Sequence, residues 1–166
     1  MNKQTPDAID LLDADHLTLH ALFANYRELV RAGAPALQRR ALAEEICMEL
    51  TIHARLEEEI FYPAVRELLR EDEPIDEAED QHGSQREFVA RILSLSPEDA
   101  LYDAKVVVLS EYVDRHVRTE REQVFNRVLA SRLDLQALGR RITERRNELR
   151  SVVEALREET LAYALA

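Results

Sequence analysis

One spacing occurs twice in this chain, in His53-Ala54-Arg55-Leu56-Glu57 and in His116-Val117-Arg118-Thr119-Glu120. Both segments lie in stretches whose apolar residues recur every three or four positions, a pattern typical of amphipathic helices. Residues four apart on a helix are neighbours, with Cβ atoms about 5–6 Å apart, so the imidazole and the carboxylate can reach one ion. The repeated spacing therefore predicts two metal-chelating pairs on two different helices.

The composition favours helices throughout. The 166 residues include only three Gly and five Pro, with 46% hydrophobic and 33% charged residues. A chain of this length suits one domain with its own core, and it needs neither a disulfide nor a metal merely to fold. The single cysteine, Cys47, excludes a disulfide framework and fits a reducing compartment. We expect an all-α protein in which any metal serves a function.

Charge and hydropathy restrict the partners and the location. The net charge of -11 argues against binding to nucleic-acid phosphates, which requires a concentrated basic face. No apolar run approaches the roughly 18 residues of a membrane span, and the polar N-terminal residues do not resemble a signal peptide. We therefore expect a cytoplasmic protein with neither a nucleic-acid partner nor a membrane partner.

Four predicted helices carry the metal-type residues. The first covers about 7–31 and the second about 35–70, with Pro63 expected to bend the second just beyond its chelating pair. The third follows an acidic connection, and the fourth is expected to start at Ser96-Pro97-Glu98-Asp99, with Ser96 as its cap. Four such helices would enclose a site inside a bundle.

The C-terminal part has a different character. An amphipathic segment begins near Asp134 and contains no metal-type residues on its apolar face. We expect residues 1–130 to form the metal-binding domain. Residues 131–166 should form an additional C-terminal helix, packed on the bundle or at a homodimer interface.

Two further histidines stand where an apolar residue is expected, His16 on the first helix and His82 on the third. The candidate metal ligands are therefore His16, His53, Glu57, His82, His116 and Glu120. Burying such groups without partners would cost roughly 1–3 kcal/mol for each neutral group and more for each carboxylate, a cost that metal coordination removes. The alternative is that the histidines bond to nearby backbone and the glutamates point to water.

Four other residues have a weaker case. His20 follows His16 by four positions but lies off the apolar seam, and Cys47 suits a packing role better than ligation. Glu49 could accept a hydrogen bond from a ligating imidazole or be solvated. Tyr112 could donate a hydrogen bond to a bound oxygen species, although such a tyrosine more often packs.

The ligand types narrow the choice of ion. Imidazole with carboxylate and no thiolate suits iron, with zinc or manganese as alternatives. Two octahedral irons offer about twelve positions, of which four histidines, two bridging glutamates and one bridging oxygen species fill about ten. The remaining positions would accept dioxygen, peroxide or nitric oxide.

At these residues the chain resembles the hemerythrin-like family, also called the hemerythrin HHE cation-binding domain. The most specific element is His53-x-x-x-Glu57-Glu58 followed by Phe61-Tyr62-Pro63. The other matching segments, within about 8–130, are Ala14-Asp15-His16, Asp80-Gln81-His82 and His116 to Glu120. The resemblance implies an antiparallel up-down four-helix bundle that holds two non-heme iron ions with an oxo or hydroxo bridge.

The chain departs from the oxygen-carrying members of that family. They have a second histidine four residues from the one on the third helix, where this chain has Ala78 and Arg86. They also have an aspartate five residues after the last histidine, where this chain has Arg121, with Glu120 one residue nearer. These departures favour the broader bacterial branch, whose members are linked to redox sensing, peroxide decomposition, nitric oxide handling and iron homeostasis.

The expected function is thus that of a diiron protein that binds a small oxygen species (O2, H2O2 or NO) for redox sensing or detoxification. The alternatives are a catalase-like, peroxide-decomposing diiron oxidoreductase, an iron storage or sensing protein, and a metal-free helical interaction module.

Overall fold

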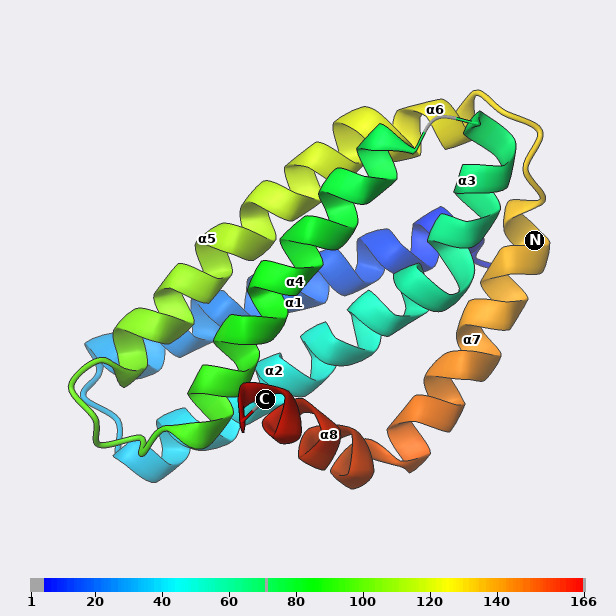
Figure 1. Cartoon of the computed structure of the whole chain (residues 1–166). Coiled ribbons are helices and arrows are strands. Elements are labelled where there is room, and N and C mark those ends of the chain that lie inside the picture. Colours follow the sequence, from blue (N-terminus) through cyan, green and yellow to red (C-terminus); the bar gives the residue numbers. More distant parts are fainter. Residues whose placement is uncertain (1–4, 71, 166) are drawn as a thin grey trace.

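The computed structural model describes residues 5–70 and 72–165, and this part of the chain contains helices and no strand, which confirms the all-α prediction (Figure 1). The elements are α1 (Ala8–Arg31), α2 (Ala36–Leu56), η1 (Glu57–Phe61), α3 (Tyr62–Leu69), α4 (Glu73–Ser94), α5 (Tyr102–Glu120), η2 (Arg121–Phe125), α6 (Asn126–Leu129), α7 (Leu135–Ser151) and α8 (Val153–Leu165). None of the helices within the described ranges combines the length and the apolar character needed to cross a membrane.

Helix α1 begins where its side chains can satisfy the free backbone donors. The Asp10 backbone N–H donates to the Asp7 carboxylate at 3.0 Å, and the Asp7 N–H donates to the Asp10 carboxylate at 3.1 Å, which completes a capping box. At the other end, Gly33 has a φ of 65°, a conformation that side chains disfavour and that ends the helix.

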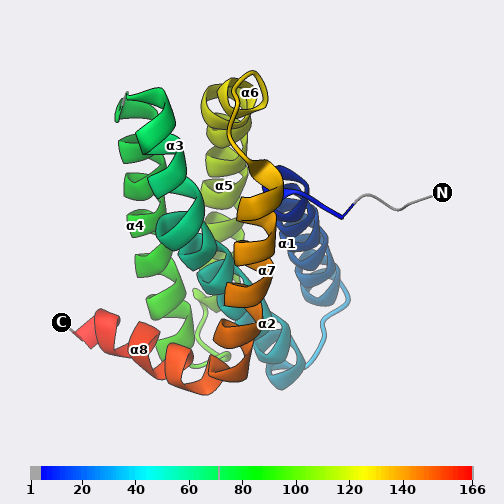
Figure 2. The ribbon, with the colours of Figure 1, turned by 90° about the vertical axis from the view of Figure 1, so that its right-hand side faces the viewer.

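The four long helices lie side by side, α1 beside α2 and α5, and α4 beside α2 and α5 (Figures 1 and 2). Their apolar faces form two separate clusters of buried side chains. One cluster contains Leu12, Leu56 and Phe125, and the other contains Leu19 and Leu50. On α1, His16 lies between Leu12 of one cluster and Leu19 of the other, and on α2, His53 lies between Leu50 and Leu56 in the same way. The two histidines therefore belong to a polar layer between the two apolar clusters.

The second predicted helix is interrupted at its chelating pair. The Tyr62 backbone N–H donates to the carbonyl of Glu57, five residues earlier, so Glu57–Phe61 forms a π-helical turn, η1. Pro63 has no N–H to offer Glu59, and a wider turn accommodates this loss. A second π-helical turn, η2, directly follows Glu120. The position of Pro63 in the sequence predicts a bend at this point, but no sequence pattern predicted either π-helical turn.

Two predictions about helix boundaries are wrong. Helix α5 begins at Tyr102, and the segment around Ser96 forms turns in which the Leu101 N–H donates to the Asp99 carboxylate at 2.8 Å. The C-terminal segment forms two helices, because Val152 leaves the helical conformation with φ -121° and ψ 26°. Helix α7 then packs along α1 and α2, while α8 turns toward α4 (Figure 2).

Candidate metal centre

The structure brings all six predicted ligands together in the polar layer. His16 comes from α1, His53 from α2, His82 from α4 and His116 from α5, and the carboxylates of Glu57 and Glu120 join them. All six side chains are buried, and the two glutamates have no exposed surface. Four separate helices thus each deliver one imidazole to the same place.

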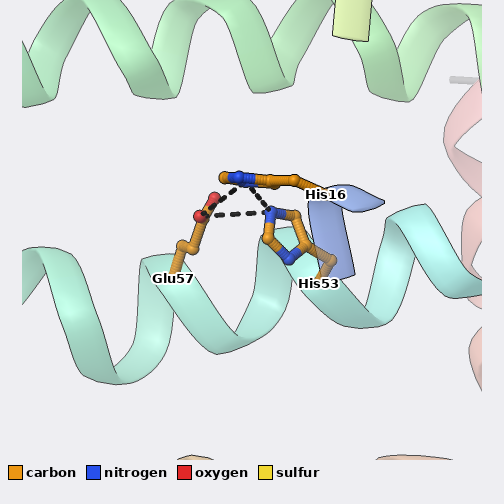
Figure 3. A group of neighbouring side chains, drawn as sticks. All are labelled: His16, His53 and Glu57. Carbon is orange, nitrogen blue, oxygen red and sulfur yellow. Dashed lines mark hydrogen bonds and ion pairs between the residues drawn. The ribbon is translucent and has the colours of Figure 1, made fainter. Parts of the chain in front are cut away.

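The carboxylate of Glu57 divides the histidines into two pairs. Its Oε1 lies 3.1 Å from the Nε2 of His53 and 3.9 Å from that of His16. Figure 3 shows the carboxylate of Glu57 facing both rings. Its Oε2 lies 3.0 Å from the Nε2 of His82 and 3.6 Å from that of His116. One carboxylate oxygen therefore faces each pair, which is the arrangement of a carboxylate that bridges two cations.

Each histidine pair brings two ring nitrogens into close contact. The Nε2 atoms of His16 and His53 are 3.1 Å apart, and those of His82 and His116 are also 3.1 Å apart. When the protons are on the Nδ1 atoms, the facing Nε2 atoms present lone pairs to each other and repel. A proton or a metal cation between them removes this repulsion.

Every Nδ1 atom has its own acceptor, which holds the proton on that side of the ring. The acceptors are Asp13 for His16 at 3.3 Å, Asp15 for His53 at 3.1 Å, Glu58 for His82 at 2.9 Å and Gln81 for His116 at 3.0 Å. Such contacts fix the tautomer and the orientation of a metal-binding imidazole. All four Nε2 atoms are thereby left free to bind metal.

Arginines hold three of these acceptors in place. Arg121 donates to Asp13 at 2.9 Å, Arg86 to Glu58 at 3.0 Å, and Arg146 to Asp15 at 2.5 and 2.9 Å. Arg146 belongs to α7, a segment to which the sequence analysis assigned no part in the site. No local pattern could have revealed it, because 131 positions separate Arg146 from Asp15.

Glu120 and Tyr62 complete the layer. The Oε2 of Glu120 lies 3.3 Å from the Nε2 of His16 and 3.9 Å from that of His116, one member of each pair. The buried Tyr62 hydroxyl lies 3.0 Å from Glu120 Oε1 and 3.1 Å from Glu57 Oε2. This role of Tyr62 was not predicted from the sequence, although the residue belongs to the Phe61-Tyr62-Pro63 motif.

The electrostatics of the cluster favour positive charge between its members. Burial lowers the pKa of His53 and His82, but the neighbouring carboxylates outweigh burial and raise these pKa values to about 10 and about 9. Burial likewise raises the pKa of Glu57, but His53 and the other imidazoles bring it well below its usual value. Without a metal, the cluster would therefore hold protons at neutral pH.

The donor set fits cations. Glu57 Oε1 and Glu120 Oε2 are buried carboxylate oxygens without a hydrogen-bond partner among the described residues, and both face imidazoles. Two groups of three donors lie close enough to hold an ion, and they share one residue: His16, His53 and Glu57, and Glu57, His82 and His116. The cluster is compatible with two metal ions that share Glu57.

The weaker candidates lie outside this cluster. The His20 side chain is 71% exposed, with Nδ1 3.8 Å from Asp114. Glu49 faces Arg150 at 3.3 Å instead of an imidazole. Cys47 packs in the apolar cluster around Leu19, where burial raises the pKa of its thiol, and Tyr112 packs against Phe88 with ring centroids 5.1 Å apart.

The helical fold and the buried imidazole–carboxylate cluster define a candidate metal-binding helical domain. Residues 7–128 match the model of one family, the hemerythrin HHE cation binding domain, and the chain belongs to this family. The recognition made from the sequence motifs is thus confirmed.

The chain is also similar to two known proteins, to one in structure and to the other in sequence. The fold is shared with a hemerythrin HHE cation binding domain-containing protein from Mycobacterium kansasii, with a TM-score of 0.73 at 22% identity over 94% of this chain and 99% of that chain. A protein of Nostoc sp. (strain PCC 7120) named DNA nickase is 29% identical over 124 residues, 75% of this chain. The aligned part is only 34% of the length of that relative.

Proposed function

We propose that the protein holds two non-heme iron ions in the polar layer and binds a small oxygen species there. His16 and His53 would bind one iron, and His82 and His116 the other. Glu57 and Glu120 would bridge the two ions within an antiparallel up-down four-helix bundle. The observation that carries the proposal is the position of Glu57, with one carboxylate oxygen toward each histidine pair.

Iron fits this donor set better than the softer metals that prefer thiolates. The iron pair would supply open coordination positions and electrons for dioxygen, peroxide or nitric oxide. The chain itself would orient the imidazoles through their Nδ1 acceptors and hold both carboxylates through the Tyr62 hydroxyl. The apolar clusters on either side of the layer would limit its contact with water.

Access for a small molecule is available beside one histidine pair. A hollow of about 480 Å³ between α1 and α5 has His16 in its wall, together with Val113 and Arg121. The contact of this hollow with His16, a proposed ligand, would let oxygen, peroxide or nitric oxide reach the metal positions. We infer a role in redox sensing or detoxification, with catalase-like peroxide decomposition as the enzymatic form of this role.

The C-terminal segment would support the site from outside. We propose that residues 1–130 form the metal-binding unit and that residues 131–166 pack on it, with Arg146 holding Asp15. We do not propose a DNA-nicking activity like that named for the Nostoc relative. The net charge of -11 opposes binding to DNA phosphates. The single buried cysteine suits the cytoplasm.

Iron analysis tests the proposal. Metal-free protein supplied anaerobically with ferrous iron should retain about two iron ions per chain, one for each of the two groups of donors that share Glu57. Glu57→Ala and Glu120→Ala should each lose iron and lower the melting temperature of the iron-supplied protein, because metal binds only the folded form. His20→Ala is the matched control and should retain iron. Fewer than one iron per chain in the wild-type protein would contradict the diiron assignment.

A further inference from the structure

A second cavity lies on another side of the protein, between α2, α4 and α8. Its volume is about 320 Å³, at the small end of the range for ligand pockets. Helix α8 forms one wall with Leu156, Thr160 and Tyr163, and the facing walls come from α2 and α4. Figure 1 shows α8 beside α2 and α4.

Gln85 is the unusual residue of this cavity. Its side chain lines the cavity and is only 2% exposed, yet neither its amide nitrogen nor its amide oxygen has a hydrogen-bond partner among the described residues. Leaving such a group unpaired costs roughly 1–3 kcal/mol, so buried amides normally find partners. An amide with both a free donor and a free acceptor is suited to a ligand group that can accept and donate at once.

Apart from the exposed Tyr163, the other polar residues of the cavity already have partners. Arg86 donates to Glu58 at 3.0 Å, and Arg55 donates to Glu159 at 2.9 Å, so the charges in the wall form two neutral pairs. The hydroxyls of Thr51 and Thr160 donate to backbone carbonyls four residues earlier. A charged ligand would find no unpaired counter-charge among these residues. The remaining wall is apolar and includes Leu50, Ala54, Val89 and Leu156.

We propose that this cavity binds a small uncharged molecule with an apolar body and one hydroxyl-type group, which pairs with the Gln85 amide. An alcohol or an organic hydroperoxide has this chemistry, because each carries an O–H donor and an oxygen acceptor on a hydrocarbon body. The bound molecule lies beside Glu58, which accepts the Nδ1 proton of His82. The cavity wall also includes His82, a proposed iron ligand, so the binding of this molecule is tested both with and without iron.

The test uses two probes of nearly equal shape on the full-length protein. The probe 2-phenyl-2-propanol carries a hydroxyl where tert-butylbenzene carries a methyl group, and benzoate serves as the charged probe. Binding is measured by ligand-observed NMR titration, with and without iron. We expect 2-phenyl-2-propanol to bind to both forms, to shift the side-chain amide resonances of Gln85, and to bind more tightly than either other probe.

A matched pair of variants isolates the amide. Gln85→Met keeps the length of the side chain but removes both hydrogen-bonding groups, so the alcohol should bind about tenfold more weakly while tert-butylbenzene should bind as well or better. Gln123→Met makes the same change at an exposed position and should alter neither affinity. Ala54→Leu should fill the cavity and weaken both probes.

Three results would overturn the proposal. Equal binding of the alcohol and the hydrocarbon to the wild-type protein would mean that the Gln85 amide does not bind the hydroxyl group. Preferential binding of benzoate would mean that the ligand class is wrong. Absence of binding by all three probes would mean that the cavity is not a site for such ligands. Because the titrations include metal-free protein, these results remain distinct from failure of the diiron assignment.

Discussion

Tyr62 contacts Glu57 twice across one π-helical turn. Its backbone N–H donates to the Glu57 carbonyl, and its hydroxyl lies 3.1 Å from the Oε2 of the same residue. In an α-helix, residues five apart do not share one face, so the wider turn is what places the tyrosine over the carboxylate. The same hydroxyl also reaches Glu120 at 3.0 Å, and it therefore ties together the two carboxylates proposed to bridge the metal ions.

Tyr62→Phe removes the hydroxyl that contacts both Glu57 and Glu120. We expect the variant to fold and to bind iron with about 10–100-fold lower affinity, because the two carboxylates lose the group that orients them. Competition with a chelator measures the affinity. Tyr26→Phe is the control, since the Tyr26 hydroxyl also donates to a carboxylate, that of Asp103 at 2.6 Å, but outside the cluster. Equal iron affinity in both variants and the wild-type protein would contradict the role of Tyr62.

Two adjacent glutamates should differ sharply in their effect on metal binding. Glu58→Gln removes the charge from the acceptor of the His82 Nδ1 proton at 2.9 Å, and we expect about 10–100-fold weaker iron binding. Glu59→Gln changes a residue that pairs with Arg145 at 2.7 Å on the surface and should leave iron affinity unchanged. Chelator competition on both variants gives the comparison, and a similar loss in the two would show that only overall charge matters.

The C-terminal segment should influence the metal centre through one side chain. Arg146→Gln breaks the contacts that hold Asp15 beneath His53, so iron affinity should fall. Arg145→Gln is the control, because Arg145 is the neighbouring residue and bonds to Glu59 and Glu148 at the surface. It should leave iron affinity unchanged and lower the free energy of unfolding only slightly, since surface ion pairs contribute about 0–1 kcal/mol. Unchanged iron affinity in Arg146→Gln would mean that α7 only packs on the bundle.

The metal-free protein should lose stability as the pH rises from 7 to 10. The pKa values of His53 and His82 in the folded protein are raised to about 10 and about 9, above the usual 6.5. Their stabilising contribution is therefore complete below pH 6.5 and is lost as the pH rises through 9 and 10. Thermal unfolding of metal-free protein across this range measures the effect.

The control for the pH dependence removes the main partner of these imidazoles. In Glu57→Gln the melting temperature should change less between pH 7 and 10, because the charge that raises both histidine pKa values is gone. Parallel curves for the wild-type protein and the variant would contradict the assigned cause.

Reaction with oxygen should separate a carrier from a detoxifying or sensing protein. Helix α4 supplies only His82, where the resemblance to oxygen-carrying members of the family implies two histidines, so one iron should be more open than in those proteins. We expect the reduced, iron-loaded protein to consume oxygen irreversibly and the oxidised protein to decompose hydrogen peroxide at a measurable rate. Stopped-flow absorbance and an oxygen electrode test the two halves. Oxygen uptake reversed under vacuum would favour a carrier, and absence of both reactions would favour sensing or iron storage.

The sequence by itself determined the helical class, the family and six of the residues in the buried polar layer, but not the part that Tyr62 takes there. Helical periodicity is local, so a histidine in an apolar seam such as His16 or His82 could be assigned to the core without knowing what it faces. The spacing of His53 and Glu57 likewise placed both groups on one side of one helix. The same local rules misplaced the start of α5, because Ser96 and Asp99 have side chains that cap turns as well as helices.

Only the tertiary structure decided which oxygen faces which histidine pair, and which groups hold the imidazoles. The contact of Arg146 with Asp15 joins residues 131 positions apart, and that of Gln81 with His116 joins residues 35 apart, so neither follows from periodicity. The unpaired amide of Gln85 also appears only once α8 has closed the cavity beside it. Helical spacing fixes the side of a helix on which a residue lies, whereas the packing of separate helices fixes the partner that it meets.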